Sequence, residues 1–132
     1  MAKKSFVVWG LALCLLAVVA VSAQPKTGTD FYVGYRAAYA KATNMEALFP
    51  FISKEMRAKF DATPKDQRQM MFSMMKEIDG ITDVKVVKET PKGDGAVLDV
   101  TGIGPDKKPV KGTVNLVKEA GAWKLQVENW EM

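Results

Sequence analysis

Side chains with strong nucleophilic or metal-binding chemistry are scarce in this sequence. Its 132 residues contain no histidine and one cysteine, Cys14. A mature chain without Cys14 therefore lacks imidazole and thiolate ligands for a metal, a histidine for acid–base catalysis, and a serine–histidine triad on Ser53 or Ser73. We assign no catalytic residue, no metal site and no cofactor. Carboxylates and tyrosines are the reactive groups that remain.

Methionines are the other residues whose spacing has chemical meaning. Met70 and Met74, and likewise Met71 and Met75, lie four residues apart and would share faces of a helix. Such spacing is most typical of an adaptable apolar core, so we expect these side chains to pack in the interior. A pliable groove for an apolar ligand or partner, and a thioether site for Cu(I), are the alternatives.

Residues 1–23 are typical of a secretory signal peptide. Two lysines precede an apolar run over 6–21, and 21–23 form a small-residue cleavage pattern. Cleavage after Ala23 would place the protein in the periplasm or outside the cell. It would also remove Cys14, so the mature domain would contain no disulfide. A retained leader would instead attach the chain to a membrane, because its apolar run approaches the length that spans a bilayer.

Composition and charge favour one packed domain with a mixed polar surface. The chain is 48% hydrophobic and 26% charged, and its length suits a single domain. The formal net charge is +4, of which the two lysines of the leader contribute half. Acidic and basic residues are interleaved along the rest of the chain, so we expect no nucleic-acid partner.

The elements that must position any site follow from hydrophobic periodicity. After a flexible polar lead-in at 24–29, one domain over 30–132 begins with three helical segments: 30–42, a second segment in two pieces at 45–49 and 53–60, and 64–79. The apolar period then changes to two, which predicts strands at 82–90, 96–104, 110–118 and 123–130. Short connections favour antiparallel neighbours. We therefore predict an α+β fold, with three N-terminal helices packed on a curved four-stranded antiparallel meander sheet.

Alternation along the strands assigns the two faces of this sheet. One face is strongly apolar, and we expect the helices to cover it; it carries Leu98, Val100, Val114, Leu116, Trp123, Leu125 and Val127. The opposite face is mixed, and Glu128 is assigned to it. Three apolar residues of this outer face are candidates for an interface, because they are expected to cluster across neighbouring strands: Ile103, Val117 and Trp130.

Helices followed by a meander, with a distinctive ending, resemble the nuclear-transport-factor-2-like superfamily. The ending is the strand over 110–119 that finishes in Val117-Lys118-Glu119, followed by Gly121-Ala122-Trp123-Lys124-Leu125. The likeness covers about 29–132 and is strongest to small exported bacterial proteins of unknown function. Cystatin-like folds have one helix across a similar sheet, and the three helical segments argue against them.

The resemblance implies a cone in which helices cup over a bent sheet and enclose a cavity. Candidates for its lining are Tyr35, Tyr39, Met71, Met75, Leu98, Val114 and Trp123. Members similar to ketosteroid isomerase use an aspartate base with a tyrosine, roles that would fall to Asp99 and to Tyr35 or Tyr39. Asp99 alternates with apolar neighbours, however, and we expect it to face water.

We therefore expect an exported small binding domain without catalysis. It would hold a small apolar ligand in the cavity or bind a protein partner. Members of the superfamily often dimerise through the sheet, so a homodimer is one interpretation of the outer-face apolar residues; scattered surface residues, or cover by the ends of the chain, is the other. One alternative is a cofactor-free isomerase, cyclase or dehydratase that uses a tyrosine and a carboxylate. Another is an interaction module of the cell envelope. A membrane association is expected only with a retained leader.

Overall fold

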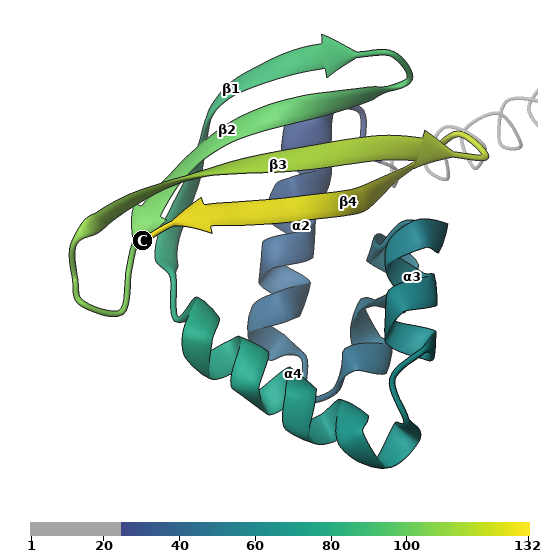
Figure 1. The fold of residues 1–132 in the computed structure, drawn as a ribbon. Helices are drawn as coiled ribbons and strands as arrows, with labels where there is room; N and C mark the ends of the chain where they lie inside the picture. Colours follow the sequence, from purple (N-terminus) through teal and green to yellow (C-terminus); the bar gives the residue numbers. More distant parts are fainter. Residues whose placement is uncertain (1–24) are drawn as a thin grey trace, which may run out of the picture.

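A computed structural model describes residues 25–132 of the chain. The predicted signal peptide and Cys14 lie outside the described residues. Helices come first, followed by strands, in the order α2 (Gly28–Lys41), the 3-10 helix η1 (Met45–Phe51), α3 (Lys54–Asp61), α4 (Lys65–Asp79), β1 (Thr82–Lys92), β2 (Gly95–Ile103), β3 (Pro109–Glu119) and β4 (Ala122–Glu131). The helices pack against a four-stranded antiparallel meander, so the predicted α+β fold is confirmed (Figure 1). None of the described helices is both long enough and apolar enough to cross a membrane.

The strands follow one another across the sheet, from β1 at one edge to β4 at the other. Short turns make this order possible. The turn between β3 and β4 has two residues, Ala120 and Gly121, with φ angles of 52° and 81°. Positive φ at both positions matches the right-handed twist of paired strands, as in a type I′ hairpin. Each connection therefore returns the chain directly beside the strand that it has just left.

Two of the three irregularities of register in the sheet decide which way the glutamates of β1 and β4 face. In β4, Asn115 pairs with Val127 while Leu116 pairs with Leu125, so Gln126 is an extra residue. In β1, Val86 pairs with Val100 while Lys88 pairs with Asp99, so Val87 is extra. Each extra residue reverses the in–out alternation beyond it. Glu89 in β1 and Glu128 in β4 are thereby turned toward the helices.

The face assignment made for the second half of β4 was therefore wrong. Leu125 is buried as expected. Strict alternation predicted Val127 on the helix-covered side and Glu128 and Trp130 on the outer side, but in the structure Glu128 and Trp130 lie on the helix-covered side. The physical reason is the extra residue Gln126, which leaves no trace in the alternation of residue types. Asp99 is exposed on the outer face, as expected.

The core lies between one face of α2 and the inner face of the sheet. Helix α2 contributes four aromatic side chains, and the strands contribute aliphatic ones: Phe31, Tyr32, Tyr35, Tyr39, Leu98, Val100, Val114, Leu116 and Leu125. Three of the four α2 aromatics are tyrosines. Their rings fill the interior as phenylalanine would, but each hydroxyl needs a polar partner when it is buried. The core therefore contains the hydroxyl groups of these tyrosines and the polar groups that bind them.

Glu89 holds the beginning of α2 against the sheet. Its carboxylate accepts hydrogen bonds from the backbone N–H groups of Gly28 and Thr29, at 3.1 and 2.8 Å, and from the Thr29 hydroxyl at 2.5 Å. These N–H groups have no partner within the helix, and the helix dipole favours a negative charge there. Burial alone would raise the pKa of Glu89, but the Thr29 and Gly28 bonds outweigh it and lower the pKa. The β1 bulge thus fixes where α2 starts.

The methionines of α4 divide between its two sides. Met70 and Met74 are 66% and 52% exposed, whereas Met71 and Met75 are partly buried and pack against the core. The interior position expected for all four therefore holds for one pair only. Residues four apart share a face, so each pair lies together, and the exposed pair is turned about 100° around the helix from the buried pair.

Replacing Leu98 with alanine should lower the free energy of unfolding by about 2–5 kcal/mol, since it leaves a cavity at a fully buried core position. Urea unfolding followed by circular dichroism measures this change. Val87→Ala is the matched control, because Val87 is 67% exposed in the β1 bulge, and its effect should stay within about 0.5 kcal/mol. Equal losses in the two variants would contradict this description of the core.

Candidate functional site

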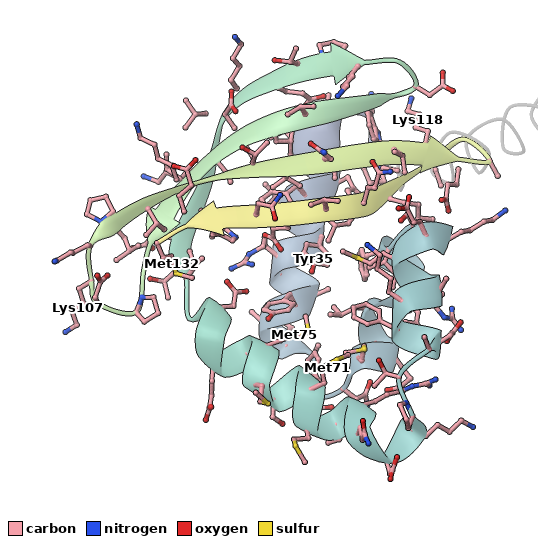
Figure 2. All side chains as sticks on the ribbon, viewed as in Figure 1. Tyr35, Met71, Met75, Lys107, Lys118 and Met132 are labelled. Atoms are coloured by element: carbon pink, nitrogen blue, oxygen red, sulfur yellow. The ribbon has the colours of Figure 1, made fainter. Side chains whose placement is uncertain are left out.

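A cavity of about 310 Å³ opens between the helices and β4. Its walls are mainly aromatic and aliphatic side chains, joined by two carboxylates: Tyr35, Tyr39, Leu48, Ile52, Met56, Phe60, Met75, Asp79, Ile81, Leu125, Glu128, Trp130 and Met132. Figure 2 shows Tyr35 and Met75 in the space between the sheet and α4, with Met132 at the end of β4. A cavity of this size and composition is at the lower end of small-molecule sites.

A buried ion-pair cluster forms the polar end of this cavity. Arg36 Nη1 lies 3.1 Å from Asp79 Oδ2 and 3.3 Å from Glu128 Oε2. Arg36 Nη2 donates to the backbone oxygen of Ile81 at 3.1 Å. The three charged side chains are only 13%, 17% and 12% exposed, in the order Arg36, Asp79, Glu128. One guanidinium from α2 therefore joins the last residue of α4 to β4.

Three donors converge on a single oxygen of Glu128. Besides Arg36, the Tyr32 hydroxyl donates to Oε2 at 2.5 Å and the Trp130 indole N–H donates at 3.3 Å. Burial raises the pKa of Glu128 and the charge of Asp79 adds to the increase, although the Tyr32 and Arg36 bonds oppose it. Burial and Glu128 also raise the pKa of Tyr32, so its hydroxyl keeps its proton and acts as a donor.

Asp79 contributes the unusual atom of the cluster. Its Oδ2 is paired with Arg36, but Oδ1 is buried and has no hydrogen-bond partner among the described residues. A buried acceptor without a partner costs about 1–3 kcal/mol and is uncommon in folded proteins. Asp79 also ends α4, where the helix dipole disfavours a carboxylate. Buried, unpartnered acceptors in a cleft are candidates for functional groups, which makes Asp79 one to consider.

Tyr35 and Tyr39 bring two more hydroxyls to the cavity wall. Burial raises the pKa of both, and nearby carboxylates add to the increase, Glu128 at Tyr35 and Asp79 at Tyr39. The Tyr39 ring lies between two cations, with Arg36 at 5.2 Å and Lys76 at 4.5 Å from its centroid. These contacts hold the Tyr39 ring in place. Both tyrosines present neutral hydroxyls and aromatic faces rather than phenolates.

The residues expected to line a cavity lie at three depths. Tyr35, Tyr39 and Met75 line the cavity, whereas Met71 packs against the core from the same helix without being part of the lining. Leu98 and Val114 are 0% exposed, because the α2 aromatics cover them completely. Trp123 is half-buried near the β3–β4 turn, with Lys118 Nζ 4.7 Å from its ring.

The three outer-face interface candidates do not form one cluster. Trp130 lines the cavity on the inner side, for the reason given by the β4 bulge. Ile103 pairs with Pro109 at one end of β2 and β3, while Val117 follows Leu116, which pairs with Ala96 at the other end. Ala96 and Ile103 are seven residues apart along β2, roughly 24 Å at about 3.4 Å per residue. Ile103 and Val117 therefore cannot belong to a single small patch.

The charged members of the site were not predicted from the sequence. Arg36 carried a usable signal, since Tyr32, Arg36 and Tyr39 fall at i, i+4 and i+7 on one face of α2. An arginine in line with core tyrosines implies buried acidic partners, because a buried charge needs a counter-charge. The sequence around Asp79 and Glu128 gave no comparable indication of burial. Asp79 is the last residue of a helix, and Glu128 faces inward only because of the bulge at Gln126.

A second hollow, about 400 Å³, lies on the other side of α2. It is bounded by that helix and by the chain around β1, and Tyr32 and Arg36 are in its lining. The remaining lining is largely apolar and, among the described residues, carries no buried side-chain polar atom without a hydrogen-bond partner: Val33, Ala37, Ala40, Ile81, Thr82, Asp83, Val84 and Val86. Although it is larger, it lacks the convergent polar groups that orient a ligand.

Replacing Arg36 with methionine should lower the free energy of unfolding by about 3–5 kcal/mol, because Asp79 and Glu128 would then be buried without a counter-charge. Urea unfolding at pH 7 measures the loss. Adding Glu128→Gln to Arg36→Met should recover part of it. Asp61→Asn is the control, since it breaks ion pairs in which Asp61 is 52% exposed and should cost no more than about 1 kcal/mol.

The stability difference between Glu128→Gln and the parent protein should depend on pH. The pKa of Glu128 is raised from its ordinary value of 4.5 in the fold. Its contribution to stability is therefore complete below pH 4.5 and is lost as the pH rises through the folded-state pKa. Glutamine does not titrate, so the variant should gain stability relative to the parent between pH 4.5 and pH 7. Thermal unfolding of both proteins across this range measures the stability difference. Glu89 is present in both proteins, so its contribution cancels. A variant that loses stability relative to the parent as the pH rises would contradict the raised pKa of Glu128.

Comparison with known proteins leaves the site to be interpreted from its own geometry. No model of a protein family matches the chain, and no curated protein or solved structure matches it. The fold itself, helices followed by a four-stranded antiparallel sheet, is common to proteins with unrelated activities. Function must therefore be argued from the cavity and its buried charges.

Proposed function

We propose that this protein is an exported, non-catalytic binding domain that holds a small, mostly apolar molecule in the cavity between its helices and β4. The observation that carries the proposal is the cavity itself, about 310 Å³ of largely aromatic and aliphatic lining with two carboxylates at one end. Ligand sites commonly combine an apolar lining with a few polar groups that fix orientation. Met56 and Met75 in the lining suit a ligand of irregular shape, because methionine adapts its conformation.

Export and membership in the nuclear-transport-factor-2-like superfamily are parts of the same proposal. Export is supported by the signal-like sequence of residues 1–23. Membership is supported by the segment Val117-Lys118-Glu119, which is followed by Gly121 and Trp123-Lys124 near the end of the chain. It is also supported by helices that lie over one face of a meander (Figure 1). A cavity between helices and sheet is where such a fold would bind its ligand.

Catalysis by a tyrosine and a carboxylate is less well supported than binding. Glu128 is the inward-facing carboxylate that such an enzyme would need, but its Oε2 already accepts from Tyr32, Arg36 and Trp130. Three donors leave this oxygen no free lone pair with which to take a proton from a substrate. Asp99, the carboxylate that the family resemblance suggested, is exposed on the outer face.

An apolar interface on the outer sheet face is also less well supported. Ile103 and Val117 lie at opposite ends of the sheet, and both are only partly exposed. Val87 is the large apolar side chain that is mostly exposed on the strands, and it stands alone in the β1 bulge. Single exposed apolar residues are normal on a protein surface.

The proposal predicts that the neutral dye N-phenyl-1-naphthylamine becomes fluorescent on entering the cavity. Met75→Trp should weaken dye binding at least about tenfold, because the larger side chain fills part of the cavity. Met74→Trp is the matched control on the same helix, since Met74 points outward and is 52% exposed. A fluorescence titration of the parent protein and both variants measures the effect. Absence of dye binding to the parent protein, or equal loss in both variants, would overturn the proposal.

A further inference from the structure

We propose that the ligand of this cavity carries a cationic amine, which the carboxylates of Asp79 and Glu128 bind while the apolar remainder lies against the aromatic and methionine wall. This inference rests on the proposed function and adds the chemical class of the ligand. It would make the protein a receptor for small amphiphilic amines.

The ionisable side chains of the cavity lining favour a cation and disfavour an anion. Asp79 and Glu128 are the charged side chains in the lining, and both are acidic. Arg36, their counter-charge, is already used: Nη1 contacts both carboxylates and Nη2 donates to the Ile81 oxygen. Two carboxylates share one guanidinium, so the ionised cluster has an excess of one negative charge. In a site shielded from water, an anionic ligand would be repelled and a cation attracted.

Asp79 Oδ1 is the atom that a bound cation would satisfy. It is buried and without a hydrogen-bond partner among the described residues, while the other oxygen of the same carboxylate is paired with Arg36. An ammonium group carries three hydrogen-bond donors and a full positive charge. It would therefore supply the donor that Oδ1 lacks and the second positive charge that the two carboxylates lack. Asp79 belongs to the cavity lining but Oδ1 itself is buried, so an amine in the cavity reaches this oxygen only when the carboxylate turns toward it.

The aromatic residues around the carboxylates suit the same kind of group. Tyr35, Tyr39 and Trp130 all belong to the lining. Arg36 and Lys76 already contact the Tyr39 ring. Tyr35 is 4% exposed and packs against other aromatic rings, so the half-buried Trp130 offers the more open aromatic surface to a ligand. Aromatic faces attract ammonium groups, and the attraction is stronger where water is excluded.

A glycine of the sheet, Gly112, makes room for Trp130 at this position. A Cβ on Gly112 would lie 2.8 Å from Trp130 Cε3, whereas a Cβ on Gly102 would lie at an ordinary contact distance of 3.5 Å from Trp130 Cη2. The indole therefore rests on sheet backbone that has no side chain beneath it. From this position its N–H reaches Glu128 Oε2 at 3.3 Å. Trp130 thus supports the carboxylate and provides an aromatic wall at the polar end of the cavity.

Three probes of one chain length test the inference: octylammonium, octanol and octanoate, each used below its critical micelle concentration to displace N-phenyl-1-naphthylamine at pH 7. We expect octylammonium to displace the dye at a concentration at least about tenfold lower than octanol, and octanoate to be the weakest of the three. In Asp79→Asn the advantage of octylammonium over octanol should disappear. Asp66→Asn, an exposed change in the first turn of α4, should leave the advantage intact.

The outcomes separate this inference from the proposed function. Octanol or octanoate displacing the dye as well as octylammonium would overturn the amine inference and leave the binding cavity standing. A parent protein that binds neither the dye nor any of the three probes would overturn the proposed function as well. Because the dye is neutral, its retention by Asp79→Asn reports an intact cavity. If that variant does not fold, the ranking of the three probes on the parent protein decides the question.

Discussion

An extra residue in the middle of β4 turns a glutamate into the interior, and much of the molecule is arranged around that charge. Gln126 shifts the alternation so that Glu128 faces the helices. A buried carboxylate needs donors and a counter-charge. Tyr32 and Arg36 supply them from α2 and Trp130 from the same strand. The position of α2 along the sheet must therefore satisfy a hydrogen-bonding requirement as well as bury apolar surface.

Polar contacts hold helix α2 in place at its first residues and again near its middle. At its first residues the Glu89 carboxylate accepts backbone and hydroxyl hydrogen bonds, and two turns later Arg36 reaches Asp79 and Glu128. The aromatic side chains between these points pack on the sheet but are not directional. Charged groups with defined partners select one alignment among several that would bury similar area, which is the best-attested use of buried polar groups.

The same charges explain why the cavity lies where it does. Asp79, at the end of α4, and Glu128 are drawn to one guanidinium, which holds α4 and β4 at a common corner. The side chains along the inner face of α4 then meet β4 across open space instead of closing on it, and Met75 and Trp130 both line the result. An interior with unfilled volume and an acceptor without a partner is less stable than a fully packed one. Such costs are common at binding sites, where structure serves a ligand as well as the fold.

The periodicity of apolar residues along the sequence was enough to predict the architecture. The pairing of the strands decided which residues form the site. The change of apolar period near Ile81 separates helices from strands, and short polar connections make the strands an antiparallel meander; both are visible because periodicity is a property of neighbouring residues. Tyr35, Tyr39 and Met75 could be placed toward the interior for the same reason. Glu89, Glu128 and Trp130 could not, because their direction depends on bulges at Val87 and Gln126 that exist only when the partner strand is present. Residue types determined which segments would pack, but the register between strands, a contact between residues far apart in the chain, determined which charges would be enclosed.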